Sequence, residues 1–392
     1  MRDRRIQAGI LLGLVAAAAF TVEFGRRPPP APEHRLPDHG PVLSDCDGAI
    51  EQIVIQYVAG AAGIVATAYR EFLDQLPKGV AVFVVCPGED DFDDFRARVG
   101  TPACRLIPVF TGHAMTSWAR DRWLALGPAG AGGPSLLLAP REESAGDIWP
   151  ARKGDGRIAG DLAAALGPGV RAHRSDLAFD GGDFVADTDS VFVTPRVGER
   201  SVGAEIASAE ELRCALAASL RRDVILLSDA PPHHAGMFMM LAGGRTALVG
   251  DPSLAPGLLA GVPASCLPEN PDFSDETQRR FDAVANQCAA NGYRVVRVPV
   301  VPGGDGRTYL TCLNVIIDRR AGRRVVYMPV YRGAEALNAA GAAAWRGLGY
   351  EVRPVDCTDT FRHFGSLRCL VNVLRRGPAT AARSDVDFAA VP

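Results

Sequence analysis

Positive charge is not concentrated anywhere in this sequence. Its 42 Lys and Arg residues are spread along 392 positions and are outnumbered by 45 Asp and Glu residues, which gives a formal net charge of -3. Proteins that bind nucleic acids use clustered cations to contact the phosphate backbone. We therefore expect no nucleic-acid partner.

The sequence also lacks the ligand spacing of a metal site. His233 and His234 are adjacent, and no further ligands follow at the intervals of a zinc site. The acidic stretch from Asp180 to Asp189 matches neither a twelve-residue calcium loop nor a repeated nonapeptide. We therefore expect no bound metal ion.

The N-terminus differs in character from the rest of the chain. Three arginines lie within residues 1–5, and residues 6–20 are apolar or small apart from Gln7. This is the pattern of an export signal, and a Pro-rich polar stretch follows it at 26–41. The apolar run is marginal for a membrane span, which needs about 20 residues. A cleaved signal and a retained anchor therefore both remain open, with a buried helix as the alternative.

We assign residues 1–24 to a signal peptide or membrane anchor and residues 25–46 to a Pro-rich linker, which predicts an exported protein, periplasmic or extracellular. In such a protein nine cysteines permit up to four disulfides and one remaining thiol, with a connectivity that the sequence does not define. The alternative is that several of them are buried thiols that behave as small apolar residues.

From residue 47 onwards, apolar runs typical of strands alternate with amphipathic runs typical of helices, which predicts an α/β fold. The apolar spacing predicts five helices, over 61–76, 157–166, 209–220, 276–290 and 334–348. Ten strands are predicted around them, over 54–58, 80–85, 105–110, 135–138, 191–194, 224–227, 246–249, 294–301, 313–317 and 324–328. Each helix lies in its own strand-rich module, so we expect a structural repeat about five times over. No further linker interrupts 47–378, which predicts one domain, and a flexible tail is expected at 379–392.

Cys369 is the candidate nucleophile. It lies four residues after Gly365, whose missing side chain permits a tight backbone approach before an apolar element. A reactive thiol needs a cationic neighbour or a base that favours the thiolate. Without such partners, a buried core cysteine is the better interpretation.

Two polar segments could supply those partners. His233 and His234 precede an apolar, strand-like run, where a histidine can act as general acid and base near neutral pH, although adjacent histidines also cap loops. Asp180 and Asp183 flank a double glycine, which permits a sharp turn and close approach to a ligand. Asp-Gly-Gly is also ordinary turn chemistry, so both interpretations stay open.

The segment from Trp118 to Trp123 combines aromatic, cationic and acidic residues and is predicted to alternate its faces as a strand. Asp121 beside an aromatic face is suited to a planar cation, which needs bidentate hydrogen bonds at its edge and cation–π contact over its plane. The alternative is a surface strand with cross-strand ion pairs.

Taken in order, these segments resemble the bacterial peptidylarginine deiminase and agmatine deiminase family of the guanidine-modifying superfamily. Trp118-Ala-Arg-Asp resembles the family's Trp-x-Arg-Asp, Asp180-Gly-Gly-Asp is similar to its Glu-Gly-Gly-Asn, and His234-Ala-Gly-Met-Phe resembles its His-x-Asp-Met-Phe. The segments 309–314 and 325–331 and the glycine-rich approach to Cys369 also resemble the family. The resemblance covers residues from about 50 to 376.

This resemblance implies a fold and a set of roles. The implied fold is a five-bladed, pseudo-symmetric α/β propeller, the pentein fold, with the site at its centre. Cys369 would attack a guanidinium carbon, and His234 would protonate the departing ammonia and then activate water. Asp180 would orient His234, and Asp121 would hold the guanidinium. The other residues expected to bind substrate are Trp118, Asp183 and Arg368.

The implied function is hydrolysis of guanidino C–N bonds through a cysteine thiouronium intermediate, which gives a ureido product and ammonia without a metal or organic cofactor. The expected substrate is a small guanidino compound such as agmatine, or peptidyl-arginine, and export mildly favours peptidyl-arginine. The oligomeric state stays open.

The sequence departs from the family at two positions. The second substrate carboxylate, two residues after the histidine, is Gly236, and the histidine that usually precedes the nucleophile is Arg368. Losing one charge-assisted hydrogen bond would cost about 1.5 to 3 kcal/mol, or roughly ten- to a hundredfold in rate or more. Either Asp183 or another carboxylate substitutes, or the substrate differs, or the protein is an inactive pentein that binds a ligand or partner. Amidino transfer is a further alternative.

Overall fold

The computed structural model describes residues 36–378 apart from 131, 143–149 and 204–205. The predicted signal or anchor at 1–24 and the predicted tail at 379–392 lie outside these residues, as does the linker up to residue 35. A compact unit begins at Asp38, so residues 38–46 of the predicted linker belong to this unit. None of the helices in the described residues combines the length and the hydropathy that crossing a membrane requires.

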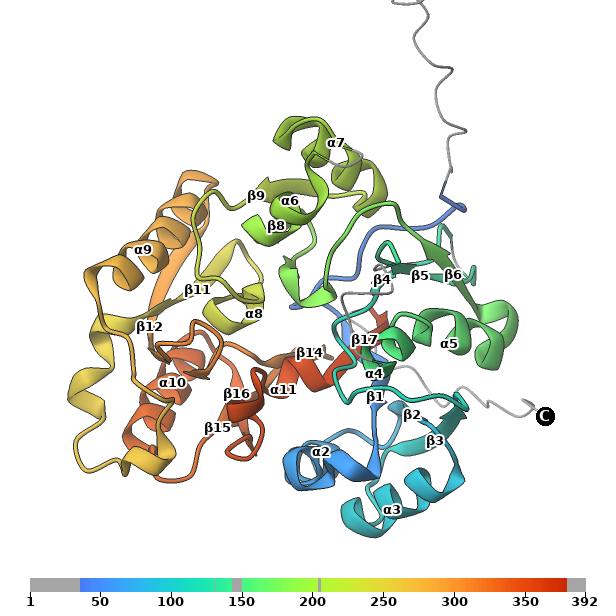
Figure 1. Ribbon diagram of the computed structural model, residues 1–392, viewed down its shortest axis with the longest axis horizontal. Coiled ribbons are helices and arrows are strands. Elements are labelled where there is room, and N and C mark those ends of the chain that lie inside the picture. Colours follow the sequence, from blue (N-terminus) through green and yellow to red (C-terminus); the bar gives the residue numbers. More distant parts are fainter. Residues whose placement is uncertain (1–35, 131, 143–149, 204–205, 379–392) are drawn as a thin grey trace, which may run out of the picture. The chain divides into compact units, whose positions relative to one another are not determined.

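The described residues of the compact unit form five sheets that repeat one pattern of connections (Figure 1). In each sheet two strands pair in antiparallel fashion, and one of them also pairs in parallel with the strand that follows a helix. This is a mixed α/β architecture, as the sequence predicted.

The bounds of the elements are as follows. The first sheet consists of β17 (Val371–Gly377), β1 (Ala49–Gln56), β2 (Ala81–Cys86) and β3 (Arg105–Phe110), with helices α2 (Ala62–Asp74) and α3 (Glu89–Val99). The second contains β4 (Leu124–Leu126), β5 (Ser135–Ala139) and β6 (Val170–Arg174), with α4 (Pro150–Asp155) and α5 (Ile158–Leu166). The third contains β7 (Phe184–Ala186), β8 (Ser190–Val193) and β9 (Asp223–Leu226), with α6 (Pro195–Ser201) and α7 (Ala209–Leu220). The fourth contains β10 (Met239–Leu241), β11 (Thr246–Asp251), β12 (Arg294–Pro302) and β13 (Tyr309–Thr311), with α8 (Ala235–Phe238) and α9 (Asp275–Ala290). The fifth contains β14 (Ile316–Arg320), β15 (Arg323–Val330) and β16 (Glu351–Asp356), with α10 (Glu335–Gly347), and α11 (Leu367–Leu370) then leads into β17.

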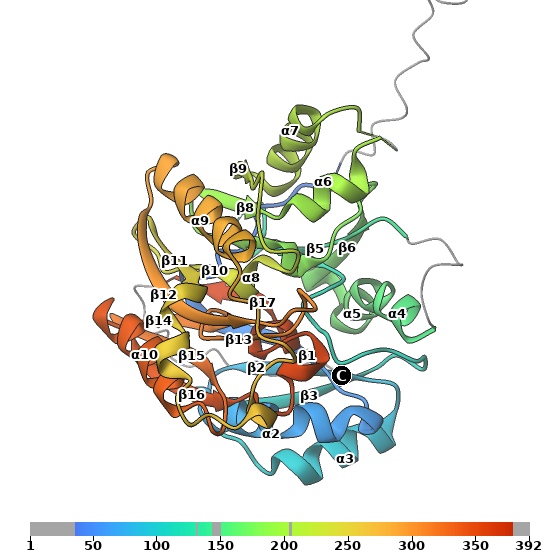
Figure 2. The same cartoon turned by 60° about the vertical axis from the view of Figure 1, so that its left-hand side comes forward.

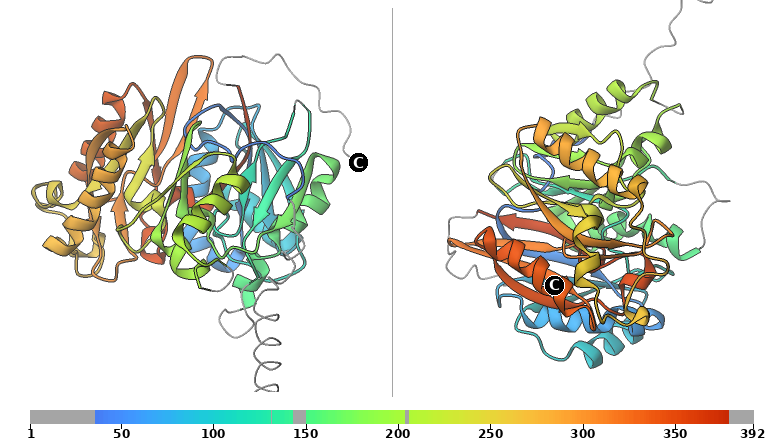
Figure 3. Two further views of the ribbon diagram at one scale, coloured as in Figure 1. Left: turned by 90° about the horizontal axis from the view of Figure 1, so that it is seen from above. Right: turned by 90° about the vertical axis from the view of Figure 1, so that its left-hand side faces the viewer.

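The first sheet joins the two ends of the described chain. β17 pairs with β1, with Val371 opposite Ile55 and Val373 opposite Ile53. In the compact unit the long helices α2, α7, α9 and α10 lie on the outside of the sheets, whereas the short helices α8 and α11 lie between modules (Figures 1, 2 and 3). Residues at the ends of different sheets can therefore lie close together in the interior, away from the outer surface.

Helix α2 illustrates why these segments fold as they do. Its buried residues are spaced by three or four positions, so they form one apolar face. That face packs in a core cluster that also contains residues of β1 and β2. β2 is buried along its whole length, as expected for an inner strand whose two faces are both covered.

All five predicted helices are present, as α2, α5, α7, α9 and α10, with ends within two residues of the prediction. The prediction of a capped start for α7 is also confirmed, because the Ser208 hydroxyl accepts a hydrogen bond from the Glu211 N–H. Helix α3 was missed, since its sequence is mostly charged and it buries only Phe95 and Val99. β16 was missed because Arg353 and Pro354 interrupt it at the edge of its sheet.

The predicted strand from Trp118 to Trp123 is wrong. The segment forms a turn, with the Asp121 N–H donating to the Trp118 carbonyl at 3.3 Å. Its backbone also bonds to a remote element, because the Arg120 N–H donates to the Cys369 carbonyl at 3.2 Å. The Arg120 side chain is buried and donates to the Gly181 carbonyl, so the alternation of polar residues here does not reflect two faces of a sheet.

All nine cysteines lie in the described residues, and all are free thiols. Seven of them are buried, one is partly exposed and only Cys214 is exposed. The alternative of buried thiols therefore describes most of these residues, and none of the permitted disulfides is formed.

Candidate active site

A cavity of about 600 Å³ collects most of the predicted site residues. Its lining consists of Thr116, Trp118, Asp121, Arg152, Asp180, Arg196, Pro232, His233, His234, Asp305, Gly306, Arg307, His363, Phe364 and Cys369. Five of the seven predicted residues are in this set, and Asp183 and Arg368 are not.

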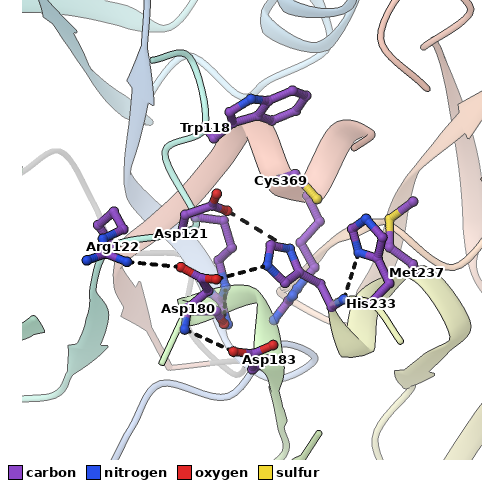
Figure 4. A network of polar contacts seen from close by, with 12 residues as sticks. Trp118, Asp121, Arg122, Asp180, Asp183, His233, Met237 and Cys369 are labelled. Carbon is purple, nitrogen blue, oxygen red and sulfur yellow. Dashed lines mark hydrogen bonds and ion pairs between the residues drawn. The ribbon is translucent and has the colours of Figure 1, made fainter. Parts of the chain in front are cut away.

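The repeated topology explains how such distant residues meet. In each module, residues shortly before the first strand of the antiparallel pair lie at the site, and Figure 4 shows Trp118, Asp121, Asp180 and Cys369 among them. Trp118 and Asp121 precede β4, Asp180 precedes β7, His234 precedes α8 and β10, Asn314 precedes β14, and Cys369 lies in α11 before β17. Equivalent positions of a repeat occupy equivalent places, so five short segments converge on one region.

Cys369 is held by its own turn and by Asn314. The thiol-bearing residue is 3% exposed, and its Sγ lies 3.5 Å from the Asn314 Nδ2. The Asn314 Oδ1 accepts hydrogen bonds from the N–H groups of Arg368 and Cys369, at 2.8 and 3.3 Å. Gly365 allows the Trp118 ring to approach, because a Cβ there would lie 2.5 Å from that ring. The sulfur is thus fixed at the wall of the cavity next to an aromatic face.

His234 lies between two carboxylates (Figure 4). Its Nε2 is 3.7 Å from the Asp180 Oδ2, and its Nδ1 is 4.0 Å from the Asp121 Oδ1. Burial alone lowers the pKa of His234, but the interactions with Asp180 and Cys369 and the negative charge of Asp121 outweigh burial and raise that pKa to about 10. The imidazole is therefore protonated at neutral pH.

Its neighbour His233 is neutral, whereas His234 is protonated. Burial, together with the charge of His234, lowers the pKa of His233 well below its usual value. The neutral ring accepts a hydrogen bond at Nδ1 from the His234 N–H, at 2.7 Å. His233 thus supports the local backbone, as in the loop-cap interpretation, whereas His234 lies near the two carboxylates.

The double glycine before β7 permits close packing rather than a simple turn. A Cβ at Gly182 would lie 2.4 Å from the His234 Nδ1, and a Cβ at Gly181 would lie 2.2 Å from the Arg120 carbonyl oxygen. Real Cβ atoms do not approach other atoms so closely. Only glycine at position 182 allows the His234 ring to lie against this segment.

Asp183 is fully buried behind Asp180. It accepts hydrogen bonds from the Asp180 N–H at 2.9 Å and from the Thr194 hydroxyl at 3.1 Å, and it pairs with Arg200. Its oxygens are used by these donors, so this geometry does not support a role for Asp183 in place of a missing substrate carboxylate. It fixes the turn that presents Asp180.

Arg368 is also buried and points away from the cavity. Its Nη2 donates to the Asp45 Oδ1 at 2.9 Å and to the Phe184 carbonyl at 2.7 Å. A Cβ at Gly236 would lie 3.1 Å from the Arg368 Nη1 and 3.3 Å from its Cδ. The two departures from the family are therefore physically linked, because the Arg368 side chain occupies the space beside Gly236.

Several lining residues were missed by sequence reasoning, and the most prominent is Arg152. Its Nη1 donates to the Asp121 Oδ2 at 2.7 Å, and its Nη2 donates to the Asp180 Oδ1 at 2.6 Å. Arg196, Asp305, Arg307, His363 and Phe364 were missed as well. No motif or spacing marked Arg152, because its partners come from other segments of the chain.

No family model matches this chain, and no curated protein matches it. Solved structures do. The agmatine deiminase of C. jejuni is 14% identical, with a TM-score of 0.63 over 86% of this chain and 96% of that chain. The agmatine deiminase of Enterococcus faecalis is 12% identical, with a TM-score of 0.64 over 88% of this chain and 99% of that chain. A Porphyromonas gingivalis protein provisionally described as an arginine deiminase is 20% identical, with a TM-score of 0.65 over 87% and 98%.

These similarities show which class of fold the chain has. The chain shares the mixed α/β fold of these solved deiminase structures. More narrowly, the solved structures that share it include agmatine deiminases, and the resemblance predicted from the motifs is thereby confirmed at the level of the fold.

Proposed function

We propose that this protein hydrolyses a guanidino C–N bond of an arginine-like compound, with the five sheets as the blades of a pseudo-fivefold propeller around the site. The observation that carries the proposal is that a thiol, an imidazole and two carboxylates from four separate modules line one cavity. Cys369, His234, Asp180 and Asp121 have the chemistry of nucleophile, general acid and base, and cation-binding groups.

In the proposed reaction, the Cys369 sulfur forms a bond to the guanidinium carbon, and the bond from that carbon to one nitrogen breaks. The His234 imidazolium supplies the proton with which this nitrogen departs as ammonia. The neutral imidazole then takes a proton from water as the water oxygen bonds to the same carbon. In the first step the sulfur reacts as a thiolate beside the His234 imidazolium. Breaking the C–S bond restores this thiolate and releases the ureido product, whose excess proton passes to water. The raised pKa of His234 supports its starting role as the acid.

Two cavity residues support recognition of a planar cation. The Asp121 Oδ1 has no hydrogen-bond partner among the described residues, and in this proposal it accepts an N–H from the ligand. Trp118 lines the same cavity and offers an aromatic face.

We also propose that residues 1–24 direct export and act as a signal or an anchor. Both peptidyl-arginine and agmatine-like compounds are candidate substrates of the exported protein.

The proposal is tested by incubating the protein with agmatine, free arginine and arginyl peptides and measuring ammonia and ureido products. Release that depends on Cys369 is expected for at least one compound. If none is turned over but one binds tightly in calorimetric titration, the protein is a silent binder, an alternative motivated by Gly236. Inactivity together with absence of binding would defeat the proposal in both forms.

Replacing Gly182 with alanine is expected to lower kcat about a hundredfold. The new Cβ forces the His234 ring away from its place, and displacements of about 1 Å at a catalytic group have effects of this size. Gly160→Ala in α5 is the matched control, because nothing lies within 4 Å of its Cβ position. The measurement is kcat of both folded variants from steady-state kinetics. A kcat for Gly182→Ala within twofold of the kcat for Gly160→Ala contradicts the prediction.

A further inference from the structure

Arg152 brings a guanidinium of the protein itself to the carboxylates proposed for the substrate. It bridges Asp121 and Asp180 with contacts of 2.7 and 2.6 Å. Its side chain is 17% exposed and lines the cavity. Such short N–H to carboxylate contacts are the ones that a bound guanidinium makes. Arg152 therefore resembles the proposed ligand in both chemistry and position.

Helix α4, which carries Arg152, is held by contacts with the backbone of residues 114–116. Asp155, one turn later in α4, is fully buried and accepts hydrogen bonds from the Thr116 N–H at 2.8 Å and from its hydroxyl at 2.7 Å. A Cβ at Gly154 would lie 1.7 Å from the Ala114 carbonyl oxygen, so α4 packs directly on neighbouring backbone. The long Arg152 side chain can leave the carboxylates by rotation while the helix stays in place.

The two oxygens of Asp121 are used unequally. Arg152 holds Oδ2, whereas Oδ1 is buried without a hydrogen-bond partner among the described residues and lies 4.0 Å from the His234 Nδ1. A guanidinium binds a carboxylate best through two parallel hydrogen bonds, one to each oxygen. While Arg152 stays in place, a ligand obtains only one of them from Asp121.

We propose that Arg152 is an internal competitor for the substrate guanidinium and thereby a specificity-determining residue. A ligand obtains bidentate contact with Asp121 only when it displaces the Arg152 side chain. The site then binds weakly those compounds that contact it only through a guanidinium group. It selects compounds that make further contacts in the cavity. This inference rests on the proposed function, because it takes the ligand to be a guanidino compound.

The test is calorimetric titration of agmatine and of arginine into the full chain, in a Cys369→Ala background that prevents turnover. Arg152→Met removes the competing N–H groups and keeps an unbranched but shorter side chain, and it is expected to lower Kd at least about tenfold, the value of one charge-assisted hydrogen bond. Arg152→Lys keeps the charge but loses the planar bridge, and an intermediate Kd is expected.

Arg200→Met is the matched control. Arg200 also pairs with Asp180, at 3.0 Å, but it does not line the cavity. Removing it changes the charge near the site without freeing an oxygen of Asp121, so a smaller gain in affinity is expected. An equal gain in both Met variants, or unchanged or weaker binding by Arg152→Met and Arg152→Lys, overturns the proposal. Failure of both ligands to bind any variant overturns it as well.

The outcomes separate this inference from the proposed function. Turnover by the unmodified protein without a gain in affinity in Arg152→Met would leave the function standing and end the inference. Tighter binding by Arg152→Met in a protein whose unmodified form has no turnover would support the inference and reject the hydrolase.

Discussion

Replacing Cys369 with alanine is expected to abolish turnover of guanidino substrates, with kcat lowered at least about 10⁴-fold. The reason is that the proposed reaction forms and breaks a bond to this sulfur, and no other thiol lines the cavity. The buried side chain loses only one atom, so the fold is expected to survive at a cost of about 1 kcal/mol. Initial rates under saturating substrate measure the effect.

The control for this variant is ligand binding. Agmatine is expected to bind Cys369→Ala within about tenfold of its affinity for the unmodified protein, since Asp121 and Trp118 are untouched. Cys214 is exposed and does not line the cavity, and Cys214→Ala is expected to keep full turnover. Turnover by Cys369→Ala within tenfold of the unmodified protein would rule out the covalent route.

Replacing His234 with asparagine is the second change with a large expected effect. Loss of a general acid and base typically costs 10² to 10⁴-fold in kcat, and both steps of the proposed reaction use this ring. We expect kcat to fall by about that factor while KM changes little. A fall of less than about tenfold in a folded variant would move the proton-transfer role to another residue.

The same substitution is expected to change how stability depends on pH. The folded-state pKa of His234 is raised to about 10, above the unfolded value of about 6.5. Its contribution is therefore fully present below pH 6.5 and disappears as the pH rises from 6.5 towards 10. The free energy of unfolding from urea titrations is expected to fall over this range by on the order of a few kcal/mol more in the unmodified protein than in His234→Asn.

His233 provides the matched control for that measurement. Its pKa is lowered by burial, so it is neutral in the folded and unfolded states above pH 6.5. His233→Asn is therefore expected to keep the pH dependence of the unmodified protein between pH 6.5 and 10. Equal pH dependence in all three proteins would mean that His234 is not protonated in the folded state.

The glycine at position 236, where the family that the motifs resemble has a carboxylate, has a structural counterpart. Arg368 fills the space next to Gly236 and is neutralised by Asp45, from the segment before β1. A buried guanidinium needs such a partner, because an unpaired charge in the interior is costly. The glycine therefore accompanies a consistent set of contacts around Arg368.

The sequence by itself determined the features that depend on neighbours along the chain. Apolar spacing is a property of one helix, so α2, α5, α7, α9 and α10 were predicted with ends within two residues. The ordered motifs also singled out Cys369, His234, Asp180, Asp121 and Trp118, all of which line the cavity. In each case the signal lies within a short stretch of sequence.

Only the tertiary structure decided where the charges are paired. Arg368 contacts Asp45, 323 positions away, and Arg152 reaches carboxylates that lie 31 and 28 positions from it. The turn at Trp118 to Trp123 likewise bonds to the Cys369 carbonyl rather than to an adjacent strand. An arginine side chain is long and finds its partner through space, so no periodicity or spacing in the sequence predicts which carboxylate it binds.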